Sequence, residues 1–148
     1  MHIAVHNRSN EPLLLDTLET LAQFVLTQEH APAAVELAVS LVSVDEIHGL
    51  NRRYRNIDAP TDVLSFECDD ANEQPARDGE PLLLGDVIIA PAVAREHARD
   101  FNSTFDDEMA LMLTHGILHL LGYDHLDDRE AEHMEARENE LLALWGVQ

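Results

Sequence analysis

Hydrophobic and polar residues alternate along several stretches of the chain, which is the pattern of strands with one buried side. Such alternation predicts strands over residues 35–44 and 63–68, and residues 3–7 also have strand character. Nearly continuous apolar residues over 82–90 predict a central strand covered on both faces. The residues between these strands do not alternate, so their apolar residues must follow a different spacing.

The remaining apolar residues recur every three or four positions, which predicts helices. The first is expected over residues 11–28, and the second follows Asp45 as its N-cap and runs to Tyr54. A third should begin at Pro91 and reach about residue 101, and Ser103 or Thr104 should cap the fourth. Asp127 or Asp128 opens the last helix, which ends at Gly146.

This order of elements predicts an α+β fold. Two strands separated by helices, then a strand pair joined by one loop, give a small mixed four-stranded sheet packed with about five helices. Residues 55–61 and 69–81 are expected loops, and Cys68 is expected to be a small buried strand residue. No repeat or linker interrupts residues 1–148, so we expect a single domain.

Charge narrows the classes of function. The chain has nine basic residues, all arginine, against 29 acidic ones, and its net charge is −20. Such a charge argues against general binding to nucleic acid, which depends on neutralising phosphates. One cysteine excludes an internal disulfide, and no segment reads as a signal peptide or approaches the ~20 apolar residues that span a bilayer. We therefore expect a cytoplasmic protein without membrane contact.

The sequence HGILHLLGYDH at residues 115–125 predicts a metal site. His115 and His119 lie four residues apart, so the predicted zinc-binding helix near the C-terminus presents both imidazoles from one face. Gly122 can end that helix and let the chain return with His125. Three imidazoles suit one Zn²⁺ ion and leave a fourth position for water, whose pKa zinc lowers to about 7. The site therefore favours hydrolysis.

The same histidine spacing occurs in metzincin proteases, which carry a glutamate as general base directly after the first histidine. This chain has Gly116 at that position, so a zinc metalloprotease is the weaker alternative. Cleavage of a phosphodiester depends more on neutralising charge, which a metal and an arginine can supply together. Arg52, Arg53 and Arg55 form the densest positive cluster, although Arg52 and Arg53 could equally be a solvated helix end.

Four motifs then appear in order: NRRYR at residues 51–55, PTDVLSF at 60–66, LGDV at 84–87 and HGILHLLGYDH at 115–125. Together they resemble the YbeY family of bacterial endoribonucleases, from about Asp45 onward. The resemblance implies a metal-dependent endoribonuclease specific for single strands, which acts in rRNA processing, chiefly 3′ end maturation of 16S rRNA, and in ribosome quality control. It also implies that His115, His119 and His125 bind zinc and that Arg55 is catalytic. Expected partners are single-stranded rRNA, the ribosomal small subunit and assembly factors.

The sequence does not decide the roles of several residues. His115 and Arg55 are the predicted catalytic residues, but the nucleophile could be water or the ribose 2′-hydroxyl. Asp86 could orient a zinc histidine, hold Arg55 or sit at a strand end in water, and Asp124 is a turn residue or a partner of a ligand. Glu67 stands where the family usually has proline. A ribosome-assembly factor whose metal is only structural is a further alternative.

Overall fold

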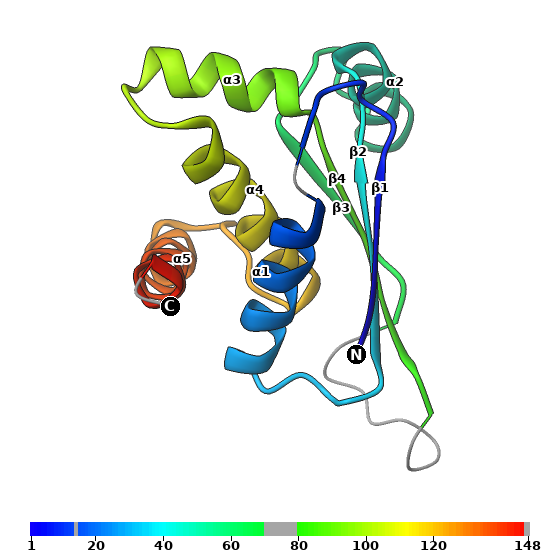
Figure 1. Cartoon of the computed structure of the whole chain (residues 1–148), viewed down its shortest axis with the longest axis vertical. Coiled ribbons are helices and arrows are strands. Elements are labelled where there is room, and N and C mark those ends of the chain that lie inside the picture. Colours follow the sequence, from blue (N-terminus) through cyan, green and yellow to red (C-terminus); the bar gives the residue numbers. More distant parts are fainter. Residues whose placement is uncertain (14, 70–79, 147–148) are drawn as a thin grey trace.

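A mixed four-stranded sheet forms the centre of the computed structural model, which describes residues 1–13, 15–69 and 80–146 (Figure 1). The strands are hydrogen-bonded in the order β1-β2-β4-β3, in which β3 alone runs antiparallel, to β4. The prediction of an α+β fold with a mixed four-stranded sheet and five helices is therefore confirmed. The elements are β1 (His2–Asn7), α1 (Leu15–Gln28), β2 (Val35–Leu41), α2 (Val44–Arg55), β3 (Val63–Glu67), β4 (Leu82–Ile89), α3 (Pro91–Asp100), α4 (Phe105–Leu120) and α5 (Asp128–Gly146).

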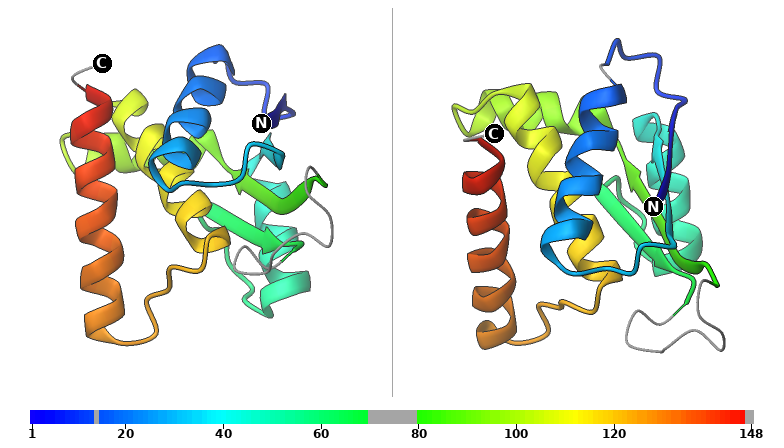
Figure 2. Two further views of the ribbon diagram at one scale, coloured as in Figure 1. Left: turned by 90° about the horizontal axis from the view of Figure 1, so that it is seen from below. Right: turned by 60° about the horizontal axis from the view of Figure 1, so that its bottom comes forward.

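Helices cover the two faces of the sheet unequally. Helices α1 and α4 lie on one face, and α5 packs on the outer side of α4, away from the sheet (Figures 1 and 2). Their apolar sides form the main core with the inward residues of β2, whose alternation Val35, Leu37, Val39, Leu41 is fully buried as predicted. On the other face α2 covers a smaller cluster around Ile47. Helix α4 is thus held between the sheet and α5.

Two predicted boundaries were wrong near the N-terminus, because side chains there cap the backbone. Helix α1 begins at Leu15 rather than at residue 11. The Asn7 side-chain amide donates to the Glu11 carbonyl at 2.7 Å and the Ser9 N–H donates to Asn7 Oδ1 at 3.0 Å, so this segment turns before the helix starts. Strand β2 ends at Leu41, since Ser43, rather than Asp45, caps α2 by accepting the Glu46 N–H at 3.1 Å.

Helix α2 covers only part of its face of the sheet, and this explains two further differences from the sequence predictions. Cys68 is exposed instead of buried, because it follows the end of β3 at a part of the sheet that α2 does not reach. Strand β4 is central, but only its second half is covered on both faces, and Leu83 remains 42% exposed. Most of the predicted loop 69–81 lies outside the described residues. Among the described residues, no helix is both long and apolar enough to cross a bilayer.

Candidate metal centre

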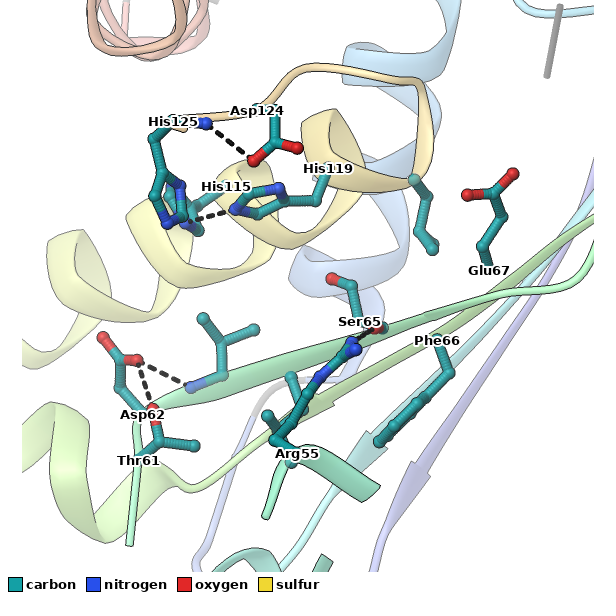
Figure 3. Close-up of a pocket in the computed structure, with 13 residues that line it drawn as sticks. Arg55, Thr61, Asp62, Ser65, Phe66, Glu67, His115, His119, Asp124 and His125 are labelled. Atoms are coloured by element: carbon teal, nitrogen blue, oxygen red, sulfur yellow. Dashed lines mark hydrogen bonds between the residues drawn. The ribbon is translucent and has the colours of Figure 1, made fainter. Parts of the chain in front are cut away.

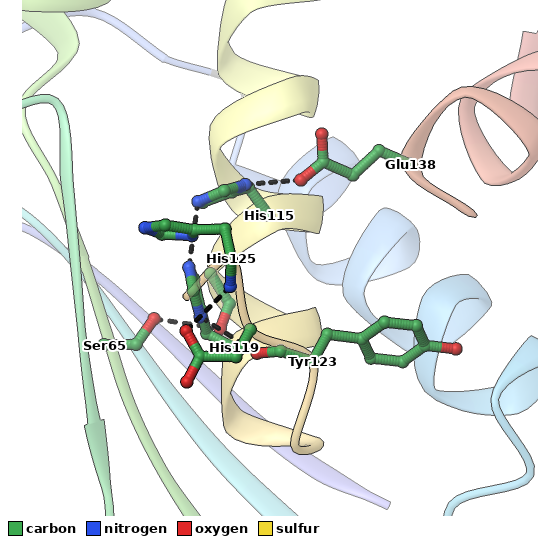
Figure 4. A network of polar contacts seen from close by, with 8 residues as sticks. Ser65, His115, His119, Tyr123, His125 and Glu138 are labelled. Carbon is green, nitrogen blue, oxygen red and sulfur yellow. Dashed lines mark hydrogen bonds and ion pairs between the residues drawn. The ribbon is translucent and has the colours of Figure 1, made fainter. Parts of the chain in front are cut away.

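Helix α4 and the turn after it bring three histidines together. Thr104 caps α4 by accepting the Asp107 N–H at 3.0 Å, and His115 and His119 follow on the last turns of the helix. The helix ends at Leu120, and Gly122, which has a φ of 102°, turns the chain as predicted so that it returns with His125. One nitrogen from each imidazole lies within 4.8 Å of the others, so these histidines form a group that could hold a metal ion (Figure 4).

The outer nitrogens of the two helical histidines have fixed partners. Nδ1 of His119 lies 3.1 Å from the Tyr123 carbonyl oxygen, and since a carbonyl oxygen only accepts, Nδ1 must donate. Nδ1 of His115 donates to the carboxylate of Glu138 from α5, whose side chain is 9% exposed. In neutral imidazoles this leaves both Nε2 atoms without a proton, and they face each other at 3.0 Å.

Two facing lone pairs at this distance repel each other unless a cation lies between them, and a metal ion is such a cation. Burial lowers the pKa of His119, and the neighbouring His115 and His125 lower it further, which favours the neutral imidazole that binds metals at this position. A carboxylate or carbonyl behind each ring is the usual arrangement for histidines that ligate metals. The donor set therefore fits a divalent ion that prefers nitrogen ligands.

Arg55 shares a cleft of about 750 Å³ with the three histidines. It comes from α2 and reaches β3 from the side of the sheet opposite to α4 (Figure 3). Because β3 is an edge strand, its outward carbonyl groups are unpaired within the sheet, and that of Ser65 accepts from Arg55 Nη2 at 2.5 Å. The Arg55 guanidinium carbon also lies 5.2 Å from the centre of the Phe66 ring. Arg55 is thus fixed at the edge of the cleft.

Gly116 packs closely against the sheet. A Cβ atom at this position would lie 2.6 Å from Val87 Cγ1 and 3.2 Å from Ser65 Oγ. Ser65 Oγ also donates to the Gly116 carbonyl at 2.9 Å, so β3 and α4 are joined at this point. A glutamate in the position of the protease base therefore has no room for its side chain. The packing that sets the helix against the sheet independently weakens the protease alternative.

The acidic residues singled out in the sequence lie around or away from this cleft. Asp86 is exposed in mid-strand on the face of the sheet opposite to α4, near His2 and Glu36, and in the described part of the chain it makes no ion pair or hydrogen bond with His115, His119, His125 or Arg55. Asp124 lines the cleft and accepts the His125 N–H at 2.8 Å, as a turn residue does. Glu67 lines the cleft as well. His97 is half-buried against Phe101, and His133 is exposed and stacks on Tyr123.

Sequence reasoning missed Glu138, although the pattern of α5 contains a signal. Glu138 stands between Met134 and Leu141 at positions i, i+4 and i+7 of the buried face, where a charged residue needs a partner. Sequence reasoning also missed Glu29, which follows α1 and joins the turn after α4 to α5. Glu29 accepts from the Tyr123 hydroxyl at 2.9 Å and from Arg137 Nε at 2.5 Å. No short-range pattern connects Glu29 to residues about a hundred positions away.

The chain is similar in sequence and in structure to known proteins. The family model described as "Endoribonuclease YbeY" matches residues 4–146. Proteins named endoribonuclease YbeY include one from Oceanobacillus iheyensis, 36% identical over 100% of this chain and 99% of its own length. Another, from Thermobifida fusca, is 42% identical over 98% and 94%. The solution structure of TM1509 from Thermotoga maritima superimposes with a TM-score of 0.64 at 31% identity, covering 98% of this chain and 92% of that one.

Proposed function

Because the chain belongs to the YbeY family of endoribonucleases, we propose that it cleaves single-stranded RNA with one zinc ion held by His115, His119 and His125. The observation that carries the proposal is the pair of Nε2 atoms that face each other 3.0 Å apart, in the same cleft as Arg55. Three imidazole donors favour zinc over magnesium or calcium, which prefer oxygen ligands. The exposed position of His125 leaves the site accessible to an RNA strand.

The histidines and Arg55 in the cleft, and the groups that hold the histidines, have separate parts in the proposed reaction. Zinc at a site of three histidines supplies a Lewis acid that polarises a phosphoryl oxygen. Arg55 stabilises the negative charge that develops on the scissile phosphate, since only one of its five N–H groups is used by Ser65. Glu138 and the Tyr123 carbonyl keep His115 and His119 turned toward the ion. The rings therefore need not reorient when the substrate arrives.

A ribosome-assembly factor with a purely structural metal is the second candidate. It predicts that the protein unfolds when the metal is removed. The described core argues against this, because some two dozen buried apolar residues form one cluster between the sheet, α1, α4 and α5 without help from the histidines. Under the proposed function, the chelated protein stays folded and loses cleavage activity.

The biological substrate that we propose is ribosomal RNA, as the family resemblance implies. Cleavage would fall in single-stranded precursor RNA at the 3′ end of 16S rRNA, on or near the small subunit and its assembly factors in the cytoplasm. Depletion of the protein in its host should then cause 16S rRNA to accumulate with extended 3′ ends. End mapping of rRNA, with and without a rescuing copy that carries Arg55→Ala, tests this assignment.

The activity itself is tested with purified, metal-quantified protein. Wild type should contain one zinc per chain, cleave single-stranded RNA, spare the matching duplex and leave unfolded casein intact. His119→Ala should lose both zinc and cleavage, whereas Arg55→Ala should keep its zinc and melting temperature and lose cleavage. Arg99→Ala is the matched control, since it removes one exposed arginine from the far end of α3. Digestion of casein without cleavage of RNA would overturn the proposal.

A further inference from the structure

The last turn of α2 exposes an aromatic ring between arginines. Tyr54 is 54% exposed, and its neighbours Arg52, Arg53 and Arg55 are exposed as well. Large aromatic side chains usually bury most of their area, so an exposed tyrosine beside three cations calls for an explanation. Favourable placement at the helix C-terminus accounts for the arginines alone. It does not account for the ring.

These side chains form an ordered row that runs from α2 to the cleft. The Arg53 guanidinium carbon lies 5.2 Å from the centre of the Tyr54 ring. The Tyr54 and Phe66 rings are 5.4 Å apart with an interplanar angle of 68°, and the Arg55 guanidinium carbon lies 5.2 Å from the centre of the Phe66 ring. We refer to Arg53, Tyr54, Phe66 and Arg55 as the arginine–aromatic row. Its inner members, Phe66 and Arg55, line the cleft that contains the histidines (Figure 3).

The arginines of the row have no acidic partner. Among the described residues, Arg8, Arg95 and Arg137 each form an ion pair with a glutamate, whereas Arg52, Arg53 and Arg55 form none. In a chain with 29 acidic residues, a cluster of unpaired arginines next to the cleft is available to an anionic ligand. A ligand that satisfies both the cations and the rings needs negative charges that alternate with flat aromatic groups.

We propose that the arginine–aromatic row is the surface on which single-stranded RNA is held before it enters the cleft. A base stacks on the exposed side of Tyr54, and phosphates contact Arg53 and Arg55, as in other proteins that bind single strands through cations and rings. Paired bases cannot present their faces to a tyrosine, so the row selects single strands. This inference rests on the proposed function, and it explains how a chain with a charge of −20 can bind RNA through a few local contacts.

The first test separates stacking from charge at Tyr54. Binding is measured by fluorescence anisotropy with the zinc-loaded protein and a 2′-O-methyl phosphorothioate oligonucleotide, whose integrity is checked on a gel. Tyr54→Leu should bind roughly 5- to 150-fold more weakly than wild type, which corresponds to the loss of one stacked base. Tyr54→Phe should bind like wild type, and Phe101→Ala, which removes a ring 71% exposed at the end of α3, is the matched control.

The second test uses an oligonucleotide of the same length without bases. Wild type and Tyr54→Leu should bind this abasic strand equally. Arg53→Gln should weaken binding to both strands and lower the slope of log affinity against log salt by about 0.7, the value for one phosphate contact on a single strand. Arg99→Gln should leave the slope unchanged. In cleavage assays, Tyr54→Leu should raise KM while kcat stays near the wild-type value.

Three results would overturn the proposal. Tyr54→Leu could bind the base-containing strand as tightly as wild type does, or it could lose equal affinity for the abasic strand. Poly-glutamate could compete as well as RNA at equal charge, which would show that the surface recognises acidic polypeptides. In each case wild type would still cleave RNA, so these results differ from failure of the proposed function, in which wild type cleaves no RNA at all.

Discussion

Replacing Gly116 by alanine should push α4 away from the sheet. The added Cβ would lie 2.6 Å from Val87 Cγ1 and 3.2 Å from Cγ2. Ordinary carbon contacts are about 3.5–4.0 Å, so one of the two elements must move by roughly 1 Å. Val87 is fully buried and β-branched, which leaves it few alternative rotamers. The helix that carries His115 and His119 therefore has to shift.

The expected loss of stability follows from two opposing effects. Overpacking of this kind costs about 1–3 kcal/mol, and the higher helix propensity of alanine returns about 1 kcal/mol. We expect a net loss of up to about 2 kcal/mol, measured by urea denaturation with an unchanged m-value. Gly49→Ala is the matched control, because nothing lies within 4 Å of a Cβ at that exposed position of α2. That variant should gain up to about 1 kcal/mol.

A double-mutant cycle with Val87→Ala isolates the contact. Without the two Cγ atoms only the 3.2 Å approach to Ser65 Oγ remains, so Gly116→Ala should stabilise the Val87→Ala background by up to about 1 kcal/mol. The sign of the effect therefore reverses between backgrounds, with a coupling of up to about 3 kcal/mol. Zinc affinity should fall with Gly116→Ala and recover in the double variant, because His115 is the preceding residue. Equal costs of Gly116→Ala in both backgrounds would refute the claim that Val87 sets the spacing.

Three further outcomes are expected. Glu138→Ala should lower zinc affinity about 10- to 100-fold in competition with a chromophoric chelator, because it leaves His115 Nδ1 without its acceptor, and an unchanged affinity would contradict this role. Asn51→Leu removes the hydrogen bond from Asn51 Nδ2 to the Ala59 carbonyl at 2.9 Å. This substitution should lower the free energy of unfolding by about 1–3 kcal/mol. It should also reduce kcat/KM, because residues 56–61 are then no longer held beside Arg55. A lower kcat/KM without loss of stability would argue against this explanation. Chelation of zinc should lower the melting temperature by mass action while the far-ultraviolet circular dichroism stays native. Unfolding on chelation would instead favour a structural metal.

The sequence predicted those parts of the molecule that depend on local patterns. The alternation in β2, the apolar run of β4 and the turn at Gly122 each follow from residues close in sequence, and the structure agrees with the strands and the turn. Boundaries failed where side chains such as Asn7 and Ser43 compete for backbone groups. Cys68 failed because alternation indicates which face a residue occupies, but it does not indicate how far a covering helix extends.

The histidine spacing does not indicate that the metal site also depends on α5. Two predicted ligands come from one helix and the third from its C-terminal turn, so the sequence indicates a site built by α4 alone. In the structure, however, α5 provides Glu138 to His115, and the adjacent Arg137 binds Glu29, which also holds Tyr123. The carbonyl of Tyr123 in turn accepts from His119. A metal ion that fixes the two rings thus also favours the docked position of α5, and by linkage the docking of α5 raises metal affinity by the same factor.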